Sequence, residues 1–599
     1  MSYLAAAERT GEWLLNSAER RPDGWRWPGQ PGVSAEFGTG VGWGTAAPTM
    51  FFAEAFATTG DERWLEAARG GARWMAANLD DVAARHAGCG LFTGIGGWAV
   101  ALDLIAESAG DEEAAALAGR ALRAIAARAD RSADGTQWDE LTEILWGTAG
   151  IGCVLLTLGP KYLGPSALDL ATGAGDWLLA EAEQAPRGIR WSLGASAYTG
   201  AGAEERRRRR YPNFAHGAAG IAFFLARLAQ QTGERRFLDA SLAATDWVMS
   251  TVRTDDGTCA AYHHEPDATD LFTLGWCHGP PGLGWLFRQL ELCTGDPAWR
   301  SWLRRAARTD LISGIPARKE PGFWDNVARC CGSASVAEFF LDLHRLEGDP
   351  GDLEFATLLV DDLLGRAITD ESGTRWSNYE YRKAEPDLPP ETGYLQGAPG
   401  IGSTLLRLHR HLAGDPWTAG WPHAPSWDHP AVRLRRIRAS AATTDSRSAV
   451  LNPASARSVS WRVCSSITFS SFLPRSVSRS RTRRRSPGCG SRRSRPAAVI
   501  RVAALVTVGV DRPSRLAISP GDRPSSRHRQ RSTNCCPSYT PCSANAAAEA
   551  WASACFADQK AVWKSPGGAA SPLFVSDMAR QAYAGEFGGA AARNSLAGL

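Results

Sequence analysis

Two kinds of apolar pattern alternate over the first 430 or so residues of the chain. Glycine-containing turns are followed by runs that are apolar nearly all round, such as Ile221 to Leu228, and such a run predicts a helix buried in an inner layer. Partner stretches such as Phe237 to Val252 are apolar on one face only, which predicts a helix of an outer layer. Each unit is therefore predicted to be a helical hairpin.

The pattern occurs seven times, with roughly 50 to 70 residues between successive turns, which is room for two helices and their loops. The turns are marked by Gly44, Gly94, Gly147, Gly217, Gly279, Gly332 and Gly397. Strand signals are sparse, and short alternating pieces such as Gly188 to Ser192 and Thr374 to Trp376 predict small loop hairpins at most. The expected fold class is all-α, an α/α toroid of seven hairpins, in which the residues before the glycines gather on one face.

Two of these turns carry thiols. Cys277 lies in the turn before Gly279, and Cys330 and Cys331 directly precede Gly332. A soft divalent metal needs several sulfur or imidazole ligands that converge from different chain segments, so the three thiols indicate a zinc ion (Zn²⁺) with one open position for water or a substrate thiol. The competing interpretation is that they are buried apolar residues, because free cysteine is commonly buried and the chain has 13 cysteines.

Other turns carry groups suited to acid–base chemistry. His216 precedes the glycine of an earlier turn, and beside a zinc ion it becomes a candidate proton donor or acceptor, although a lone histidine there also fits a packing role. Glu143 is the corresponding carboxylate, with Asp139 and Glu140 as competitors, and each of the three also fits a solvated helix charge. His278 fits a metal ligand, a local hydrogen-bonding group or a residue of the substrate cleft, and we expect the cleft.

Taken together, these motifs resemble the lanthionine synthetase C-like family, the cyclases of lanthipeptide biosynthesis. The resemblance covers about residues 1–430 and rests on four motifs in order: Ala215-His216-Gly217-Ala218-Ala219-Gly220, Trp276-Cys277-His278-Gly279-Pro280-Pro281-Gly282, Cys330-Cys331-Gly332 and Gly397-Ala398-Pro399-Gly400. Any one of these motifs alone would be unspecific.

The resemblance implies an α/α toroid whose zinc is held by a cysteine of one turn and a cysteine–histidine pair of the next. Cys277 and Cys330 match the first two ligands. Cys331 stands where most members have histidine, although some cyclase domains of the family also have Cys-Cys-Gly there. Glu143 falls where many cyclases have aspartate, and Thr273 where some have an arginine. A site of three thiolates carries more negative charge than the usual one.

The reaction implied by the resemblance is addition of a cysteine thiol to dehydroalanine or dehydrobutyrine in a precursor peptide, which closes a thioether ring. Zinc would lower the thiol pKa, and His216 would protonate the enolate at the α-carbon. No dehydratase or kinase motif is found, so a separate dehydratase is expected to supply the dehydrated precursor peptide.

The composition bears on the partners and the cellular compartment expected for this chemistry. A net charge of +3, from 66 basic and 63 acidic residues, provides no general attraction to nucleic acid or membrane. No apolar run reaches the ~20 residues of a membrane helix. The start of the chain has no secretory signal, so we expect a cytoplasmic protein with reduced thiols.

The pattern stops at about Pro430. From Ser446 to Val510 there is no acidic residue, and lysine is absent from Ala384 to Gln559. Such an arginine- and serine-rich segment predicts disorder, although arginine without lysine also fits a coding sequence read out of frame. The expected organisation is a cyclase domain over 1–430 and a tail over 431–599.

Three other functions also fit the sequence. The same site suits addition of a small thiol such as glutathione to dehydrated residues in proteins. A toroid that has lost its chemistry suits a non-catalytic peptide-binding scaffold. A carbohydrate-active toroid would use paired carboxylates and no metal.

Overall fold

The structure, a computed structural model, describes residues 1–33, 38–197, 203–317, 326–379, 387–415 and 421–427. The described residues all belong to one compact unit. The tail predicted for 431–599, and with it the predicted disorder, lies outside the described residues.

The described residues fold mainly into helices. They are α1 (Tyr3–Ser17), α2 (Ala46–Thr59), α3 (Glu62–Ala83), α4 (Ile95–Ala109), α5 (Glu112–Ala127), α6 (Thr148–Tyr162), α7 (Ser166–Ala180), α8 (Ala203–Arg207), α9 (Ala218–Thr232), α10 (Arg235–Ser250), α11 (Pro280–Thr294), α12 (Ala298–Ile312), α13 (Ser333–Glu347), α14 (Pro350–Gly365) and α15 (Ala398–Leu412). Short 3₁₀ turns cover Ala195–Ala197 and Asp255–Gly257. None of these helices is long and apolar enough to span a membrane.

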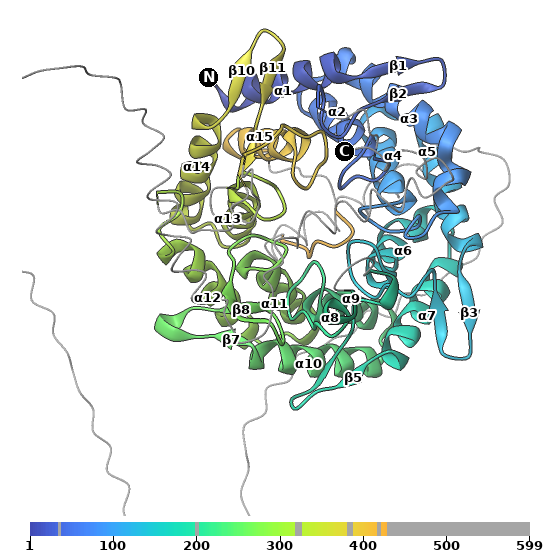
Figure 1. The fold of residues 1–599 in the computed structure, drawn as a ribbon, viewed down its shortest axis with the longest axis vertical. Helices are drawn as coiled ribbons and strands as arrows, with labels where there is room; N and C mark the ends of the chain where they lie inside the picture. Colours follow the sequence, from blue (N-terminus) through green and yellow to red (C-terminus); the bar gives the residue numbers. More distant parts are fainter. Residues whose placement is uncertain (34–37, 198–202, 318–325, 380–386, 416–420, 428–599) are drawn as a thin grey trace, which may run out of the picture. The chain divides into compact units, whose positions relative to one another are not determined.

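The long helices form two concentric layers of an α/α toroid, as the sequence predicts (Figure 1). Helices α2, α4, α6, α9, α11, α13 and α15 contact one another in this order, and α15 contacts α2, so the inner layer is closed. The inner helix α4 is buried from Ile95 through Ala106, whereas the outer helix α5 is buried along one face only. An inner helix packs on both sides, which explains its nearly uniform apolar sequence.

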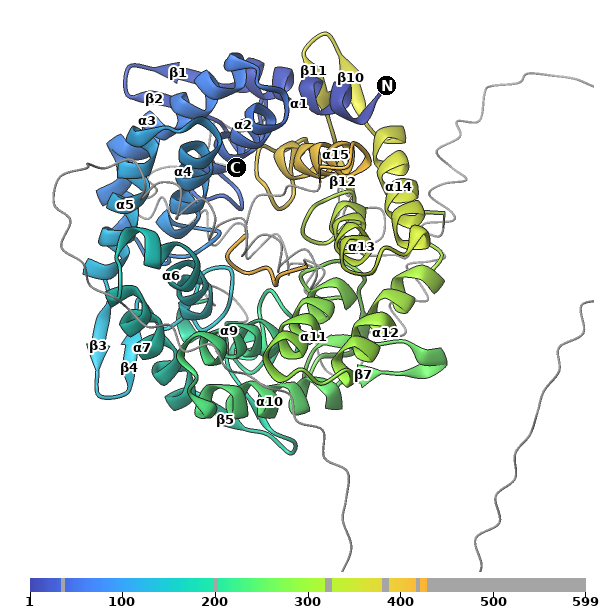
Figure 2. The same cartoon turned by 180° about the vertical axis from the view of Figure 1, so that it is seen from behind.

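Helix α1 has a role that the repeat pattern did not predict. It packs against α15 and is the outer partner of this last inner helix, so the two ends of the ring are joined by the start of the chain (Figure 2). The indole of Trp27 donates to the carbonyl of Leu14 in α1 at 2.7 Å, and Trp376 donates in the same way to Leu363 in α14. This shared contact identifies α1 as an outer helix of the repeat.

Small antiparallel sheets follow several outer helices. They comprise β1 (Glu19–Arg21) with β2 (Gly24–Arg26), β3 (Asp130–Ser132) with β4 (Gly135–Gln137), β5 (Glu183–Gln184) with β6 (Ile189–Arg190), β7 (Val252–Arg253) with β8 (Ala260–His264) and β9 (Ala268–Phe272), β10 (Ile368–Asp370) with β11 (Gly373–Arg375), and β12 (Asn378–Tyr379) with β13 (Asp387–Leu388). The loop hairpins predicted near Gly188 and Thr374 are β5–β6 and β10–β11.

The turn glycines stand at the start of the inner helices. Six of the seven are N-cap residues, and Gly44 directly precedes the N-cap of α2. The backbone of the six N-cap glycines is extended, so the need for glycine is steric: a Cβ at Gly217 would overlap the carbonyl of Tyr211. The chain folds back tightly on itself before each inner helix.

A belt of backbone hydrogen bonds joins these turns to one another. In six of the seven turns, the residue two positions before the turn glycine donates its N–H to the equivalent carbonyl of the next turn, at 2.8 to 3.3 Å: Ala215 to Cys277, Cys277 to Cys330, Cys330 to Leu395, Leu395 to Gly42, Gly42 to Phe92 and Phe92 to Leu145. We call these bonds the turn belt. It gathers the residues before the glycines at one end of the ring, as the repeat predicts.

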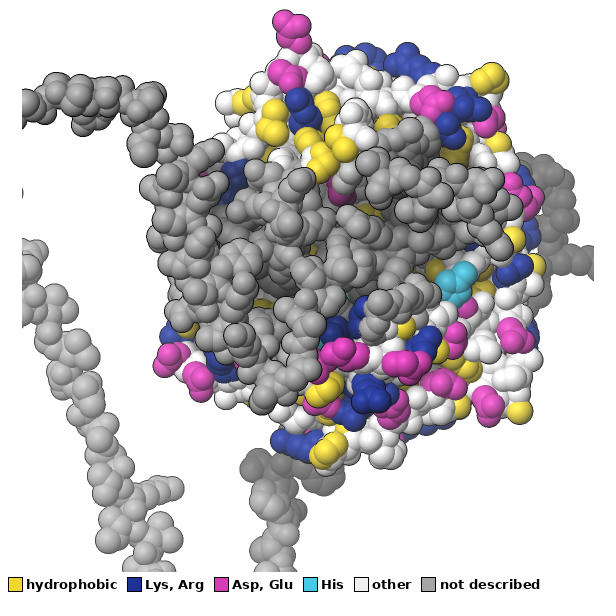
Figure 3. Space-filling view, viewed as in Figure 1, with side chains coloured by type: hydrophobic (Ala, Val, Ile, Leu, Met, Phe, Trp, Pro, Cys, Tyr) yellow, Lys and Arg dark blue, Asp and Glu magenta, His cyan; other side chains and the backbone are white. Residues whose placement is uncertain are grey.

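Residues 421–427 lie inside the ring of inner helices in both views (Figures 1 and 2). Trp421 stacks on Phe92 with ring centroids 5.3 Å apart, and His423 lies 5.3 Å from Trp276. The outside of the ring is different: basic and acidic side chains are interspersed over the visible rim (Figure 3), as expected for the solvated faces of amphipathic helices.

Candidate metal centre and acid–base site

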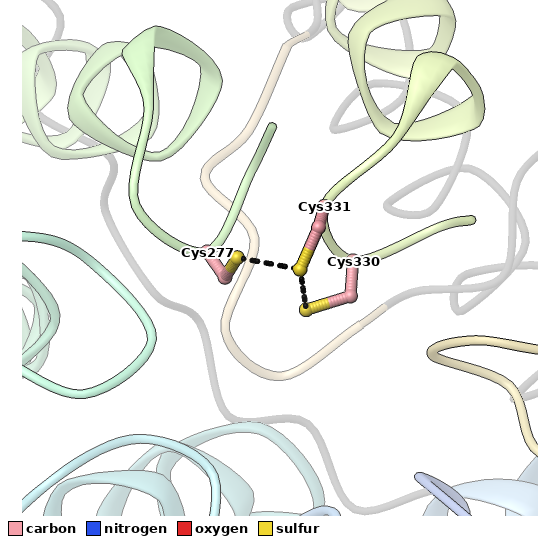
Figure 4. Close-up of side chains that lie close together, drawn as sticks. All are labelled: Cys277, Cys330 and Cys331. Carbon is pink, nitrogen blue, oxygen red and sulfur yellow. Dashed lines mark hydrogen bonds between the residues drawn. The ribbon is translucent and has the colours of Figure 1, made fainter. Parts of the chain in front are cut away.

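The three predicted thiols converge at the turn end of the ring. Cys277 Sγ lies 3.1 Å from Cys331 Sγ, and Cys331 Sγ lies 3.5 Å from Cys330 Sγ. Figure 4 shows the sulfurs pointing toward one another from two different turns. All three side chains are buried and none is in a disulfide.

The turn belt explains this convergence. Cys277 and Cys330 occupy the same position of two successive turns, and the N–H of Cys277 donates to the carbonyl of Cys330 at 3.3 Å. A Cβ at Gly275 would come within 2.5 Å of the Cys331 backbone, so only glycine lets the two turns approach this closely. The repeat thus brings together thiols that are far apart in sequence.

The donor set fits a zinc ion. The three sulfurs lie within 4.8 Å of one another, a spacing that allows all three to bind one ion at about 2.3 Å. Hydrogen bonding with Cys277 and Cys331, together with burial, raises the pKa of Cys330 well above its ordinary value. Three buried thiolates would repel one another without a cation, and helices α11 and α13 begin just after them with their positive ends.

Beside the thiols the structure brings His216 and Glu143 together. His216 Nδ1 lies 3.6 Å from Glu143 Oε2, and Glu143 is fully buried. The carboxylate also accepts the N–H groups of Leu145 and Trp146, each at 2.7 Å. The turn belt has no bond from the N–H of Leu145 to the carbonyl of Ala215. The Leu145 N–H donates to the Glu143 carboxylate instead.

The two competing carboxylates lie elsewhere. Asp139 accepts the N–H groups of Leu141 and Ala87, and Glu140 accepts the N–H of Ser196. Burial raises the pKa of Asp139. Among the three candidates, Glu143 is the one with a contact to His216.

His278 follows Cys277 and lies in a cluster of imidazoles. Its ring is 5.5 Å from that of His216 and stacks on His263 with centroids 4.1 Å apart. It is not part of the group of sulfur ligands. His263 and His264, whose Nδ1 atoms are 2.7 Å apart, were missed in the sequence because they lie in β8, away from the turns. Burial beside Arg209 lowers the pKa of His264 to about 3.

Sequence reasoning also missed Gln396. This residue directly precedes Gly397, the place that Cys331, His278 and His216 hold in their turns. Its Nε2 lies 3.7 Å from Cys331 Sγ. Its position directly before a turn glycine, equivalent to that of Cys331, was the sequence signal that would have identified Gln396.

The sequence profile of the family described as "Lanthionine synthetase C-like protein" matches residues 39–418, which is more than half of the chain. No curated protein sequence matches the chain.

Solved structures of helical-ring proteins resemble this chain only distantly. Nisin cyclase is 14% identical over 64% of this chain and 92% of its own, with a TM-score of 0.46. An alpha-1,6-mannanase (GH76A) from Salegentibacter sp. HEL1_6 is 13% identical over 69% of this chain and 99% of its own, with a TM-score of 0.36. A cellobiose 2-epimerase from Spirochaeta thermophila is 17% identical over 67% of this chain and 93% of its own, with a TM-score of 0.35. Such low scores carry no information about activity or substrate.

Proposed function

Because the chain belongs to the lanthionine synthetase C-like family, we propose that it is a zinc-dependent cyclase that forms thioether rings in a dehydrated precursor peptide. The observation that carries this proposal is the cluster of three buried sulfurs from two successive turns, within 4.8 Å of one another. A peptide-binding scaffold without chemistry would not need such a cluster.

In this proposal Cys277, Cys330 and Cys331 hold the zinc ion. When bound, zinc lowers the pKa of a thiol and makes it nucleophilic near neutral pH. The third thiolate, in place of the histidine of most members, gives the site one more negative charge.

His216 and Glu143 handle the proton. The new C–S bond forms at the β-carbon of dehydroalanine or dehydrobutyrine as the carbon–carbon π bond breaks, and the thiol loses its proton. The α-carbon must then gain a proton, which His216 is placed to donate. Glu143, 3.6 Å from His216 Nδ1, orients the ring. The product has the same mass as the substrate.

His278 is proposed to line the substrate cleft between the thiols and His216. Its ring lies 5.5 Å from that of His216 and its backbone adjoins Cys277. The stacked neighbour His263 holds the His278 ring in one orientation.

The partners and location are proposals of the same kind. A separate dehydratase would supply the dehydrated peptide. A cytoplasmic location suits a site of reduced thiols, because disulfides form mainly in oxidising compartments.

The function is tested by incubating the protein with a dehydrated, cysteine-containing peptide. A cyclase removes the free peptide thiol, measured by alkylation, without changing the peptide mass. Cys277→Ala is expected to abolish both zinc binding and ring closure, whereas Cys293→Ala, a half-buried cysteine outside the cluster, keeps both. Unchanged ring closure in Cys277→Ala would refute the proposal.

The same assay separates the cyclase from a small-thiol adder. With glutathione present, an adder increases the peptide mass by that of one or more thiols, whereas a cyclase closes the ring at unchanged mass. The carbohydrate-active alternative predicts a native protein without zinc.

A further inference from the structure

The amide of Gln396 contacts one of the three sulfurs. Gln396 Nε2 lies 3.7 Å from Cys331 Sγ, a distance compatible with an N–H···S hydrogen bond to a large acceptor. Gln396 is half-buried and stands at the end of the turn before α15, next in the ring after the turn that carries Cys331. It reaches the sulfurs from outside the pair of turns that carry them.

A short relay of side chains fixes which end of this amide faces the sulfur. The Oδ1 of Asn326 accepts the N–H of Ala328 at 2.7 Å, so its Nδ2 is left to donate to Gln396 Oε1 at 3.5 Å. Asn378 Nδ2 lies 3.4 Å from the same oxygen. With two amide donors at its oxygen, Gln396 presents its N–H₂ group to Cys331.

The side chain and the backbone of Gln396 have separate tasks. Its carbonyl accepts a hydrogen bond from Asn378, a contact that survives any change of the Gln396 side chain. The contact to Cys331 belongs to the side chain alone. Substitution at this position therefore removes the sulfur contact and the two contacts of Oε1 with Asn326 and Asn378, but it keeps the backbone bond to Asn378.

The hydrogen bond from Gln396 to Cys331 would affect how the sulfur binds a metal. A neutral donor that hydrogen-bonds a thiolate ligand withdraws charge from the sulfur and holds it in place, and loss of such outer contacts typically weakens metal binding by about 10- to 100-fold. Three thiolates on one ion concentrate more negative charge than two thiolates and a histidine. A carboxylate at position 396 would add to this charge, whereas an amide offsets it.

We propose that Gln396 is a positioning residue that donates a hydrogen bond to Cys331 Sγ, fixes this sulfur as the third metal ligand and moderates its charge. This inference rests on the proposed zinc site and deepens it. It assigns a role in the site to the seventh turn, which contributes no metal ligand of its own.

The test compares Gln396→Met, which keeps the side-chain length but loses the donor, with Gln30→Met as a matched control. Gln30 is also half-buried, and its amide donates to the carboxylate of Glu391 at 3.0 Å instead of to a sulfur. Zinc affinity is measured by competition with a chelator, and the sulfur-to-metal charge-transfer band is recorded after loading with Co²⁺.

Gln396→Met is expected to lower zinc affinity about 10-fold or more and to shift the Co²⁺ band, while Gln30→Met behaves as the unaltered protein. An affinity within about 2-fold of the unaltered protein, with an unchanged band, would overturn the inference. Should Gln396→Met fail to fold, Gln396→Glu gives the same readouts, with an affinity loss expected from the added negative charge.

The outcomes also separate this inference from the proposed function. If the unaltered protein binds no zinc, both the inference on Gln396 and the proposed function are refuted. If it binds zinc and Gln396→Met binds it equally well, the inference alone falls. If Gln396→Met weakens zinc binding but the unaltered protein closes no rings, the inference stands and the proposed function falls.

Discussion

The sulfurs of Cys277 and Cys331 lie 3.1 Å apart although the two cysteines are 54 positions apart in the chain. The repeat produces this proximity, because the N–H of Cys277 donates to the carbonyl of Cys330, which holds the equivalent position of the next turn and directly precedes Cys331. Residues that directly precede the turn glycines also come close in two neighbouring pairs, His216 with His278 at 5.5 Å between rings and Gln396 Nε2 with Cys331 Sγ at 3.7 Å. Cys331, His278, His216 and Gln396 all hold this position.

Replacing Cys331 by histidine tests whether the third thiol is a ligand. Cys331→His reproduces the ligand set expected of most family members, so it is expected to keep about one zinc per chain. Cys331→Ala is expected to lose at least about 10-fold in zinc affinity, since it removes a ligand outright. Metal analysis after dialysis checks both variants. Equal zinc affinity in Cys331→Ala and the unaltered protein would show that Cys331 is no ligand.

Changes at His216 separate proton transfer from metal binding. His216→Gln keeps the size of the side chain but cannot act as the acid, so kcat for ring closure is expected to fall about 10² to 10⁴-fold at unchanged zinc content. Tyr211→Phe, which alters a neighbour of the His216 ring, is the matched control and is expected to change kcat far less. A His216→Gln enzyme with full activity would remove His216 from the mechanism.

Glu143 accepts two backbone N–H groups and contacts His216, so its substitution is expected to affect both stability and catalysis. Glu143→Gln retains one oxygen, so one of the N–H groups of Leu145 and Trp146 loses its acceptor, at a cost of about 1–3 kcal/mol in the free energy of unfolding. The rate of ring closure is also expected to fall, because His216 loses its charged partner. In a double variant with His216→Gln, the loss in kcat should be less than the product of the two single losses.

Truncation tests the role of residues 421–427 inside the ring. A chain that ends at Pro430 keeps Trp421, His423 and Trp427, and is expected to retain its melting temperature and its zinc. A chain that ends at Asp415 loses these buried side chains, each large aromatic being worth about 3–5 kcal/mol, and is expected to unfold or to melt far lower. Equal melting temperatures for the two truncated chains would contradict the structure.

The stability of the protein is expected to depend on pH through Glu54. Burial raises the pKa of this carboxyl to about 7 in the folded protein. A carboxyl with a raised pKa stabilises the fold below its unfolded pKa, and this contribution is lost as pH rises from about 4.5 through about 7. Glu54→Gln should therefore be more stable than the unaltered protein at pH 8, by up to about 3 kcal/mol, and similar to it at pH 4. Thermal melts at both pH values check this, and a difference that does not change with pH would contradict it.

The sequence predicted the inner helices and the cluster of thiols because both depend on local pattern. Runs such as Ile221 to Leu228 are apolar all round, and each turn glycine marks the start of a helix. Once the turns are equivalent, the meeting of Cys277 with Cys330 and Cys331 follows from the repeat.

Features that depend on contacts between distant segments were not predicted. The pairing of α1 with α15 joins the two ends of the ring, and the apolar pattern of α1 does not indicate which helix it packs against. The stacking of His263 on His278 arises from a strand that lies between two repeats. The choice of Glu143 over Asp139 and Glu140 needed the positions of the backbone N–H groups that each carboxylate accepts.

X-ray absorption at the zinc edge of the purified protein tests the central claim most directly. The proposed site predicts about one zinc per chain with three sulfur neighbours at about 2.3 Å and one lighter atom, and in Cys277→Ala this signal should be lost. A native protein without zinc, or zinc surrounded by oxygen and nitrogen alone, would contradict the account.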